Sequence, residues 1–247
     1  METEAFIRLP YSTREEWLKK RIKGIGGSDC SAIVGFNPYK TNVDLWNEKM
    51  SETHIEIPDN PAMKYGRDTE DAIRTIFQAD YDGYLKVTHT NELLVSKEHD
   101  FIRASLDGEI EVLEDVKISS YFKNWNKEIK EPAPQPFELK KGMKGVLEIK
   151  TTELMSSIHK EKWNNQVPYN YYCQILHYLY VTNYDFAILR ALINTEDENG
   201  VKTSHTRTYV FMRSMHQDSM GFLINKEIEF WNEYVLKKEQ PPLILTM

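Results

Sequence analysis

The chain has 247 residues, of which 40% are hydrophobic and 28% charged, values that are ordinary for a globular protein long enough to bury a core. The sequence has no apolar run of the ~20 residues that span a bilayer, and its acidic start lacks the basic segment and apolar core of a signal peptide, so we expect a cytoplasmic protein with no membrane contact. The formal net charge of −7 argues against a protein that coats nucleic acid non-specifically, but it permits contact with DNA through a local basic groove.

The first predicted helix covers residues 11–22, Y-S-T-R-E-E-W-L-K-K-R-I. Ser12 or Thr13 is a suitable N-cap, and Glu15 or Glu16 can complete a capping box. The side chains that we expect on the packed side of this helix are Trp17, Leu18 and Ile22.

A glycine-rich segment, G-I-G-G-S-D-C-S-A-I-V-G, follows at residues 24–35. It predicts a flexible turn and then a short helix that Ser28 or Asp29 caps and Gly35 closes. Backbone N–H groups at such a helix start suit a phosphate, although the segment does not match the phosphate loop G-x-x-x-x-G-K-[ST]. An ordinary capped turn is the alternative interpretation.

Two further helices are predicted next. Thr41, after the turn F-N-P-Y-K, can cap the helix V-D-L-W-N-E-K-M, and the polar residues 51–62 predict a loop. Residues 63–77 predict a helix that places Glu70 on the same face as Phe77. A carboxylate on a mostly inward face suggests a function, and a solvent-exposed glutamate is the alternative.

Residues 84–113 alternate in hydropathy well enough for two or three strands. Within them F-I-R-A-S-L-D-G-E-I, residues 101–110, predicts a short apolar strand with Asp107 and Gly108 at its end. A plain hairpin turn is the alternative interpretation of this Asp-Gly pair.

Residues 116–144 differ from the rest of the sequence. Seven lysines and three glutamates give the segment Lys117–Lys144 a balance of +4 inside an acidic protein. Tyr121, Phe122 and Trp125 interleave with the lysines, a pattern that suits nucleic acid through phosphate attraction and base stacking. A β-hairpin extension or a solvated loop that packs its aromatic side chains locally is an equally weighted alternative.

The stretch G-V-L-E-I-K-T-T, residues 145–152, predicts a buried strand whose two-residue period places Glu148 and Lys150 on one face. Charged groups in such a place need partners, a metal ion or a substrate. If this strand neighbours residues 101–110, Asp107 reaches the same face, and the group then suits a hard cation such as Mg²⁺ and phosphodiester hydrolysis. A Glu–Lys ion pair on a solvated face is the alternative.

The sequence P-Y-N-Y-Y-C-Q-I-L-H-Y-L-Y-V, residues 168–181, predicts a helix that begins at Pro168. Tyr171, Gln174 and Tyr178 lie on one stripe of this helix, at spacings of three and four residues. Aromatic stripes are usually part of the core, and the glutamine is the unusual member of this one.

The rest of the sequence adds secondary structure but no further motif. Residues 185–193 and 206–212 predict a strand pair joined by a polar loop, and an amphipathic helix is predicted over about 216–238. Cys30 and Cys173 lack C-x-x-C spacing, so the sequence indicates neither a zinc site nor an iron–sulfur cluster.

Five motifs between Trp17 and Tyr178, about two thirds of the chain, carry a resemblance to a known family. They are R-I-K-G-I-G-G-S-D with F-N-P-Y-K-T, Y-G-R-D-T-E, S-L-D-G, L-E-I-K and Y-Y-C-Q-I-L-H-Y. With them the chain resembles the PD-(D/E)XK nucleases and, among these, the YqaJ-like viral recombinase family that includes phage lambda exonuclease. The resemblance implies an α/β fold with a central mixed β-sheet flanked by helices, the restriction-endonuclease-like core. It would form a single domain over residues 1–247 with an inserted basic segment at about 115–144.

Carried over to this sequence, the resemblance implies roles for six active-site side chains. Asp107 and Glu148 would bind the catalytic Mg²⁺, and Lys150 would place or polarise the attacking water. Glu70 would complete the acidic site and help to bind a second metal ion, as in two-metal phosphoryl chemistry. The two side chains that would border the site from the predicted helix are Tyr171 and Gln174.

The resemblance also implies a pocket for the 5′-phosphate of DNA. Arg21 and Ser28, which are seven residues apart, match this pocket, and so does Ser105. The sequence departs from the family pattern at Ser156, where lambda exonuclease has a further arginine. A second departure is the basic and aromatic insertion that separates the two expected metal ligands.

The implied function is that of a Mg²⁺-dependent deoxyribonuclease, with Mn²⁺ as the alternative ion. It would degrade linear double-stranded DNA processively from 5′ to 3′ and leave 3′ single strands for phage-type recombination. The implied assembly is a ring-shaped homotrimer that acts on DNA ends and has a single-strand annealing protein as its partner. An endonuclease or structure-specific nuclease on the same core is one alternative, and a catalytically silent DNA-end-binding adaptor is another. The complete set of Asp107, Glu148 and Lys150 argues against the silent adaptor.

Overall fold

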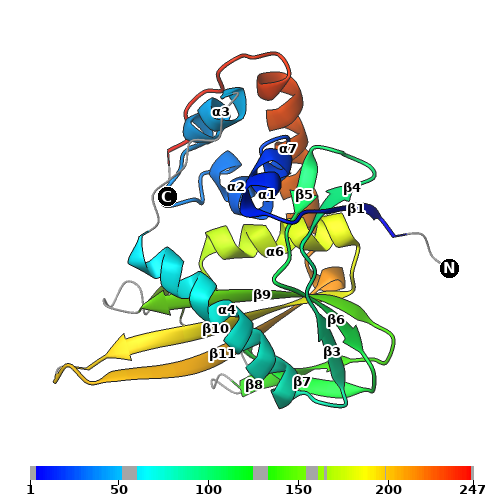
Figure 1. Ribbon diagram of the computed structural model, residues 1–247, viewed down its shortest axis with the longest axis vertical. Coiled ribbons are helices and arrows are strands. Elements are labelled where there is room, and N and C mark those ends of the chain that lie inside the picture. The colour runs from blue at the N-terminus through cyan, green and yellow to red at the C-terminus, as the bar shows by residue number, and fades with distance from the viewer. Residues whose placement is uncertain are drawn as a thin grey trace.

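Two mixed β-sheets and a separate two-stranded ribbon, with helices against them, make up the molecule (Figure 1). The structure is a computed structural model that describes residues 4–51, 60–124, 133–153, 161–163, 166–197 and 199–245. Within these ranges no helix combines the length and the apolar character needed to cross a membrane.

The larger sheet contains the strand predicted around residues 145–152. Its members are β3 (Leu85–Thr88), β6 (Gly108–Val112), β9 (Lys144–Glu153), β10 (Phe186–Glu196) and β11 (Lys202–Met212). Their order in space is β11-β10-β9-β6-β3, so β9 is the middle strand. β9 and β10 pair in parallel and all other neighbours are antiparallel, which confirms the expected central mixed sheet.

Helices cover both faces of this sheet. α4 (Pro61–Asp80) packs on the face that presents Leu147, and α6 (Tyr169–Thr182) packs on the face that presents Val146. Because successive side chains of a strand point to opposite faces, Glu148 faces the same side as Val146 and therefore faces α6. The helices predicted over residues 63–77 and 168–181 are both confirmed, with Pro168 as the cap of α6.

The described part of residues 116–144 forms a β-hairpin. β7 (Val116–Asn124) pairs antiparallel with β8 (Ala133–Leu139), and Ile118 and Leu139 are buried in the core on the α4 side. This agrees with the hairpin alternative for the segment. Trp125 lies outside the described residues, and the DNA contact of this segment stays a prediction.

A smaller four-stranded sheet lies beside the larger one. Its strands are β1 (Phe6–Pro10), β2 (Ile25–Gly26), β4 (Glu92–Ser96) and β5 (Ile102–Ala104), in the order β1-β4-β5-β2. The sequence predicted neither β1 nor β2, and β2 takes the place of the expected flexible turn. Residues 84–113 form four strands instead of the expected two or three.

Asp107 reaches the larger sheet by a different strand from the one predicted. β5 ends at Ala104, so Asp107 lies immediately before β6 and not at the end of a strand over residues 101–110. β6 pairs with β9, and Gly108 is opposite Leu147. The expected neighbourhood of Asp107 and the strand of Glu148 is thus formed through β6.

The N-terminal helices are α1 (Arg14–Arg21), α2 (Gly27–Ile33) and α3 (Asn42–Met50). Thr13 caps α1 and Thr41 caps α3, as the sequence predicted. Both caps are local hydrogen bonds from a backbone N–H to a threonine oxygen, which is why the sequence pattern was sufficient to place them.

The cap of α2 differs from the prediction. The helix begins at Gly27 and Gly26 is its N-cap, so the expected cap at Ser28 or Asp29 is wrong. Asp29 instead lies in the first turn, and its carboxylate accepts a hydrogen bond from the Gly26 N–H at 3.2 Å. Gly35 follows the helix with φ +76°, in the left-handed conformation expected of a glycine that closes a helix.

The C-terminal helix is interrupted. A short 3-10 turn, Arg213–Met215, precedes α7 (Gln217–Glu229), and α7 continues into a π-helical segment, η2 (Phe230–Val235). The sequence predicted one continuous amphipathic helix over about 216–238. The wider turn appears in the hydrogen bond from the Leu236 N–H to the Trp231 carbonyl, a spacing of five residues.

Candidate active site

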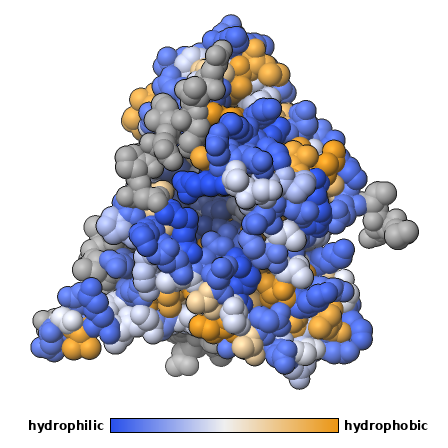
Figure 2. Space-filling view, in the orientation of Figure 1, coloured by the Kyte–Doolittle hydropathy of each residue, from blue (hydrophilic) through white to orange (hydrophobic). Residues whose placement is uncertain are grey.

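A polar cleft of about 620 Å³ lies between the N-terminal helices and the edge formed by α4, β6 and β9. Figure 2 shows this region as a hollow with a hydrophilic surface. Eight of the nine side chains that the sequence singled out line the cleft, and Tyr171 is the exception. The eight are Arg21, Ser28, Glu70, Ser105, Asp107, Glu148, Lys150 and Gln174.

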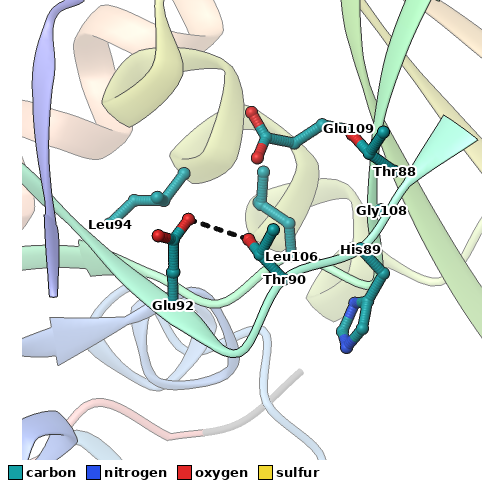
Figure 3. A pocket seen from close by; sticks show the side chains of 8 residues that line it. All are labelled: Thr88, His89, Thr90, Glu92, Leu94, Leu106, Gly108 and Glu109. Carbon is teal, nitrogen blue, oxygen red and sulfur yellow. Dashed lines mark hydrogen bonds between the residues drawn. The ribbon is translucent and has the colours of Figure 1, made fainter. Parts of the chain in front are cut away.

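Two other pockets are less suited to a reaction. One, at the turn between β3 and β4, holds about 10 Å³, close to the least volume that accommodates one water molecule. Figure 3 shows its polar side chains, of which Thr90 donates a hydrogen bond to Glu92 at 2.9 Å. The other, of about 420 Å³, is mostly apolar and lies between α2, α7 and the C-terminal tail. Neither is lined by Asp107 or Glu148.

Glu148 is the central acidic group of the cleft. It lies on β9 and is almost fully buried. Its Oε1 accepts a hydrogen bond from Gln174 Nε2 at 2.7 Å and forms an ion pair with Lys150. Its Oε2 has no hydrogen-bond partner among the described residues. Burial and the nearby negative charge of Asp107 raise the pKa of Glu148 to about 8.

Asp107 and Glu70 complete the acidic group. Asp107 Oδ2 accepts a hydrogen bond from the Ile149 N–H of β9 at 2.7 Å, so the backbone of the central strand fixes this carboxylate. Glu70 comes from α4, and burial together with the charge of Asp107 raises its pKa to about 7. Arg74 joins the two residues, because it donates to Glu70 Oε1 and to the Asp107 carbonyl, each at 2.6 Å.

The sequence reasoning did not identify Arg74. The only signal it offered was the four-residue spacing of Glu70 and Arg74 on a helix, which brings their side chains together. The bond from Arg74 to the Asp107 carbonyl joins residues 33 positions apart and has no local signature.

Lys150 keeps its charge in the cleft. Burial would lower its pKa, but the charges of Glu148 and Asp107 outweigh burial and hold the pKa above its ordinary value. The ammonium also lies 5.2 Å from the centre of the Tyr171 ring, a cation–π contact. Tyr171 therefore touches the site from outside the cleft lining.

Two hydrogen bonds fix the side-chain amide of Gln174, one to β9 and one within α6. Its Nε2 donates to Glu148 and also to the Tyr178 hydroxyl at 2.9 Å. The ring of Tyr178 lies directly against α2, since a Cβ added at Gly27 would be 2.4 Å from it. The unusual glutamine of the aromatic stripe thus holds the orientation of the buried carboxylate.

The donor set fits a divalent cation. Burial and the charge of Asp107 raise the pKa of both Glu70 and Glu148, and Glu148 presents a buried oxygen that lacks a partner among the described residues. Carboxylate oxygens are the ligands that Mg²⁺ and Mn²⁺ prefer in proteins. A cation held by these three side chains would remove both the repulsion and the unsatisfied oxygen.

A second group of side chains in the cleft is suited to an anion. The Arg21 guanidinium donates to the Ser28 hydroxyl and lies over the Trp17 ring, 5.1 Å from its centre. Trp17 Nε1 donates to the Ser105 hydroxyl at 3.1 Å. The three expected phosphate-pocket residues, Arg21, Ser28 and Ser105, are therefore connected through Trp17.

Asp29 lies buried behind this group, a position that the sequence reasoning missed. Its carboxylate is 2.9 Å from Lys49 Nζ and 3.4 Å from the Arg21 guanidinium. Burial opposes its ionisation, but Lys49, Arg21 and Lys40 outweigh burial and hold the pKa of Asp29 well below its usual range. Ser156, where the sequence departs from the family pattern, lies outside the described residues.

Comparison with known sequences identifies one family. The profile of the YqaJ-like viral recombinase domain matches residues 16–185. Over 244 residues the chain is 30% identical to a Bacillus subtilis (strain 168) protein named uncharacterized protein YqaJ. This similarity covers 97% of the chain and 62% of that relative, so the chain spans less than two thirds of the relative's length.

Comparison with solved structures identifies a shared fold. The alkaline exonuclease LHK-Exo from Laribacter hongkongensis matches with a TM-score of 0.55 at 15% identity, over 91% of this chain and 93% of that one. The structure of LHK-Exo in complex with dAMP matches with a TM-score of 0.52, at the same identity and coverage. At 15% identity this similarity shows the mixed α/β fold and its helix-flanked sheets.

Proposed function

Because the chain belongs to the YqaJ-like viral recombinase domain family, we propose that it is a metal-dependent deoxyribonuclease that degrades linear double-stranded DNA. The cation would be Mg²⁺, with Mn²⁺ as the alternative. Degradation would run processively from 5′ to 3′ and leave 3′ single strands for phage-type recombination. The shared fold with an alkaline exonuclease, and the dAMP bound to that neighbour, support a DNA substrate.

The observation that carries the proposal is the buried Glu148 carboxylate in a cleft that also holds Asp107, Glu70 and Lys150. An acidic cluster with one unsatisfied buried oxygen and one fixed ammonium has little stabilising value of its own. The cluster would become favourable when a cation and a phosphodiester bind in the cleft. The restriction-endonuclease-like PD-(D/E)XK core is the finer fold assignment that this arrangement supports.

Each side chain would have a separate role in the reaction. A divalent cation held by Asp107, Glu148 and Glu70 would act as a Lewis acid toward the phosphate and the leaving oxygen. Lys150 holds its protons, so its ammonium would orient the attacking water and donate a hydrogen bond to a phosphate oxygen. Gln174 would keep Glu148 in its orientation while DNA binds.

The anion group would select the DNA end. Arg21 offers a charged, partly exposed guanidinium beside the Ser28 hydroxyl, and both face the same cleft as the acidic cluster. A 5′-phosphate bound there would place its negative charge beside Arg21 and near Lys40 and Lys49, the two lysines that pair with Asp29. We include in the proposal a ring-shaped homotrimer and a single-strand annealing partner, which family membership supports.

The deciding experiment follows degradation of linear duplex DNA with 5′-phosphate or 5′-hydroxyl ends, beside a closed circle, with Mg²⁺ or with EDTA. We expect loss of the linear DNA alone, faster with the phosphate and stopped by EDTA. In Arg21→Ala the advantage of the phosphorylated end should shrink, while the slow rate on hydroxyl ends stays the same. Cleavage of the circle would indicate an endonuclease on the same core, and binding without cleavage in Mg²⁺ or Mn²⁺ would indicate an adaptor.

A further inference from the structure

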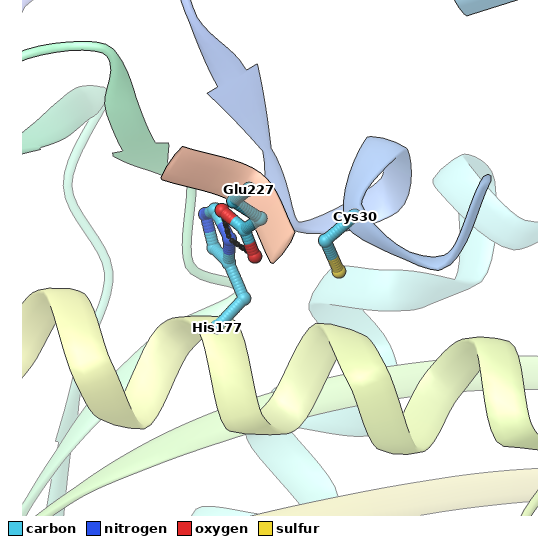
Figure 4. A group of neighbouring side chains, drawn as sticks. All are labelled: Cys30, His177 and Glu227. Atoms are coloured by element: carbon cyan, nitrogen blue, oxygen red, sulfur yellow. Dashed lines mark hydrogen bonds and ion pairs between the residues drawn. The ribbon is translucent and has the colours of Figure 1, made fainter. Parts of the chain in front are cut away.

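His177 connects three elements: α6, on which it lies, β5 and α7. It lies on α6 and is fully buried, and its Nε2 donates a hydrogen bond to the Arg103 carbonyl of β5 at 2.8 Å. Its Nδ1 lies 3.0 Å from each carboxylate oxygen of Glu227 on α7. Figure 4 shows the side chains of His177 and Glu227 facing each other.

The contacts determine how the protons are placed. A backbone carbonyl can only accept a hydrogen bond, so Nε2 of His177 carries a proton. Nδ1 and the Glu227 carboxylate must then share a second proton, because two acceptors at 3.0 Å would otherwise repel each other. Burial would lower the pKa of His177, but Glu227 and the Arg103 carbonyl outweigh burial and raise it. The three groups therefore form a fixed hydrogen-bonded unit.

A metal ion is the other occupant that these residue types suggest. Cys30, on α2, lies close to the pair, and cysteine, histidine and glutamate can together bind a cation. Their atoms already have partners, however. Both imidazole nitrogens of His177 are engaged, and Cys30 Sγ donates to the Gly27 carbonyl at 3.0 Å. The geometry favours the hydrogen-bonded unit over a metal site.

This unit is connected with the active site in two places. Gln174 stands three positions before His177, about one helical turn, and donates to Glu148. Arg103, which accepts from His177, stands four positions before Asp107. A slide or rotation of α6 against β5 would therefore separate Gln174 from the carboxylate that it orients.

We propose that His177 is a positioning residue, which holds α6 against β5 and α7 so that Gln174 keeps Glu148 in the orientation that binds the metal ion. The inference rests on the proposed function, because it takes Glu148 as a metal ligand. His177 acts through Gln174 and does not line the cleft. Its effect should therefore appear in metal binding and turnover and not in the capture of the DNA end.

The test compares the parent protein with His177→Ala, Glu227→Gln and Tyr172→Phe. Mn²⁺ affinity is measured by titration calorimetry without DNA, and kcat and KM are measured on linear duplex DNA well below each variant's thermal midpoint. For His177→Ala we expect Mn²⁺ affinity and kcat to fall by about 10-fold, the lower end of the effect of residues that orient metal ligands, with an unchanged KM.

The other two variants separate positioning from a general loss of packing. Glu227→Gln keeps a hydrogen-bonding group of the same shape opposite Nδ1, so it should retain parent values. Tyr172→Phe removes another bond between α6 and the start of α7, from the tyrosine hydroxyl to His216 Nδ1 at 2.9 Å, and it should also retain them.

Two results would overturn the inference: a folded His177→Ala with parent affinity and kcat, or equal losses in all three variants. A parent that binds Mn²⁺ and cleaves no DNA would refute the proposed nuclease, and the calorimetric comparison would still decide the role of His177. A parent that binds neither Mn²⁺ nor Mg²⁺ would overturn both.

Discussion

The charge state of Lys150 limits what this residue can do. Burial would lower its pKa, but the charges of Glu148 and Asp107 hold the pKa above the ordinary value, which favours the ammonium form over a role as proton acceptor. Its value lies in hydrogen-bond donation and positive charge. We predict that Lys150→Ala lowers the kcat of DNA cleavage by about 10²- to 10³-fold, the loss typical of one donor in the transition state. Single-turnover cleavage of a linear duplex measures this loss.

A control for Lys150→Ala lies on the same strand. Lys144 is the exposed first residue of β9 and does not line the cleft. Lys144→Ala should therefore cleave at the parent rate. Normal turnover by a folded Lys150→Ala protein would show that the assignment of the active site is wrong.

Asp29 neutralises a buried cation, and this predicts a dependence of stability on pH. The side chain of Lys49 is as buried as that of Asp29. Asp29→Asn would therefore leave the Lys49 ammonium without the carboxylate nearest to it. Breaking a buried ion pair in this way costs about 3–5 kcal/mol of unfolding free energy. Urea unfolding of the parent and Asp29→Asn at neutral pH measures the difference.

The sign of the pH effect follows from the lowered pKa of Asp29. A carboxylate whose pKa is depressed on folding contributes stability that is complete above the unfolded value of about 3.8 and is lost below it. The difference in unfolding free energy between the parent and Asp29→Asn should thus be constant from pH 7 to about pH 5 and become smaller below about pH 3.8. A difference that increases on acidification would contradict the ion-pair account.

Among individual residues, the sequence predicted those whose placement depends on local geometry. The alternation of a strand was sufficient to put Glu148 and Lys150 on one face, and helix spacing was sufficient to align Gln174 with Tyr178. Asp29 and His177 were not predicted as site residues. The partner of Asp29 is Lys49, 20 positions away, and the partner of His177 is Glu227, 50 positions away. Both partners lie on other elements, so no local pattern indicates these contacts.

Among the elements, α2 and α6 pack closely against each other beside the site. A Cβ at Gly27 would lie 2.4 Å from the Tyr178 ring, and the hydroxyl of Tyr178 accepts a hydrogen bond from Gln174. We predict that Gly27→Ala costs about 1–3 kcal/mol of unfolding free energy, the usual effect of overpacking, and lowers kcat because Gln174 moves with Tyr178. Chemical denaturation and steady-state cleavage measure the two effects.

Gly221 offers the matched substitution. It lies inside α7, and a Cβ there would meet nothing within 4 Å among the described atoms. Gly221→Ala should therefore stabilise the protein by up to about 1 kcal/mol through helix propensity and leave cleavage unchanged. Equal behaviour of the two alanine variants would contradict the close packing of α2 on α6.

The elements that the sequence failed to predict are those whose stability comes from distant partners. β2 has two residues and, among the described strands, pairs with β5 alone, and β1 pairs with β4 across more than 80 positions. Helix caps such as Thr41 were predicted because a cap is made within four residues. The π-helical turn at Phe230–Val235 replaced a continuous helix without any proline or glycine to mark it.

In the whole molecule, the smaller sheet and its helices lie beside the larger sheet (Figure 1), and residues of both line the cleft. No pattern in the sequence could predict how two sheets are placed against each other. The ordered motifs still predicted eight of the residues that line the cleft, because a family resemblance carries information on tertiary structure that periodicity lacks. In the described part of residues 116–144, Lys140 pairs with Asp115 and Glu138, and Lys141 pairs with Glu114.

The proposed metal site predicts that the stability of the whole molecule depends on divalent cations. Any ion that binds the folded state alone raises the free energy of unfolding, by about 2.7 kcal/mol when its concentration is 100 times its dissociation constant. We therefore predict that Mg²⁺ raises the urea midpoint of the parent without DNA and that EDTA reverses the rise.

Asp107→Asn should abolish that rise without lowering the stability in EDTA. The asparagine oxygen can still accept the hydrogen bond from the Ile149 N–H, and loss of the Asp107 charge relieves the repulsion that raises the pKa of Glu148. Asp115→Asn, an exposed carboxylate outside the cleft, should keep the full response to Mg²⁺. A structural carboxylate would behave in the opposite way, because its replacement would lower the midpoint in EDTA and leave the response to Mg²⁺ intact. An unchanged Mg²⁺ response in Asp107→Asn would thus remove this residue from the metal site.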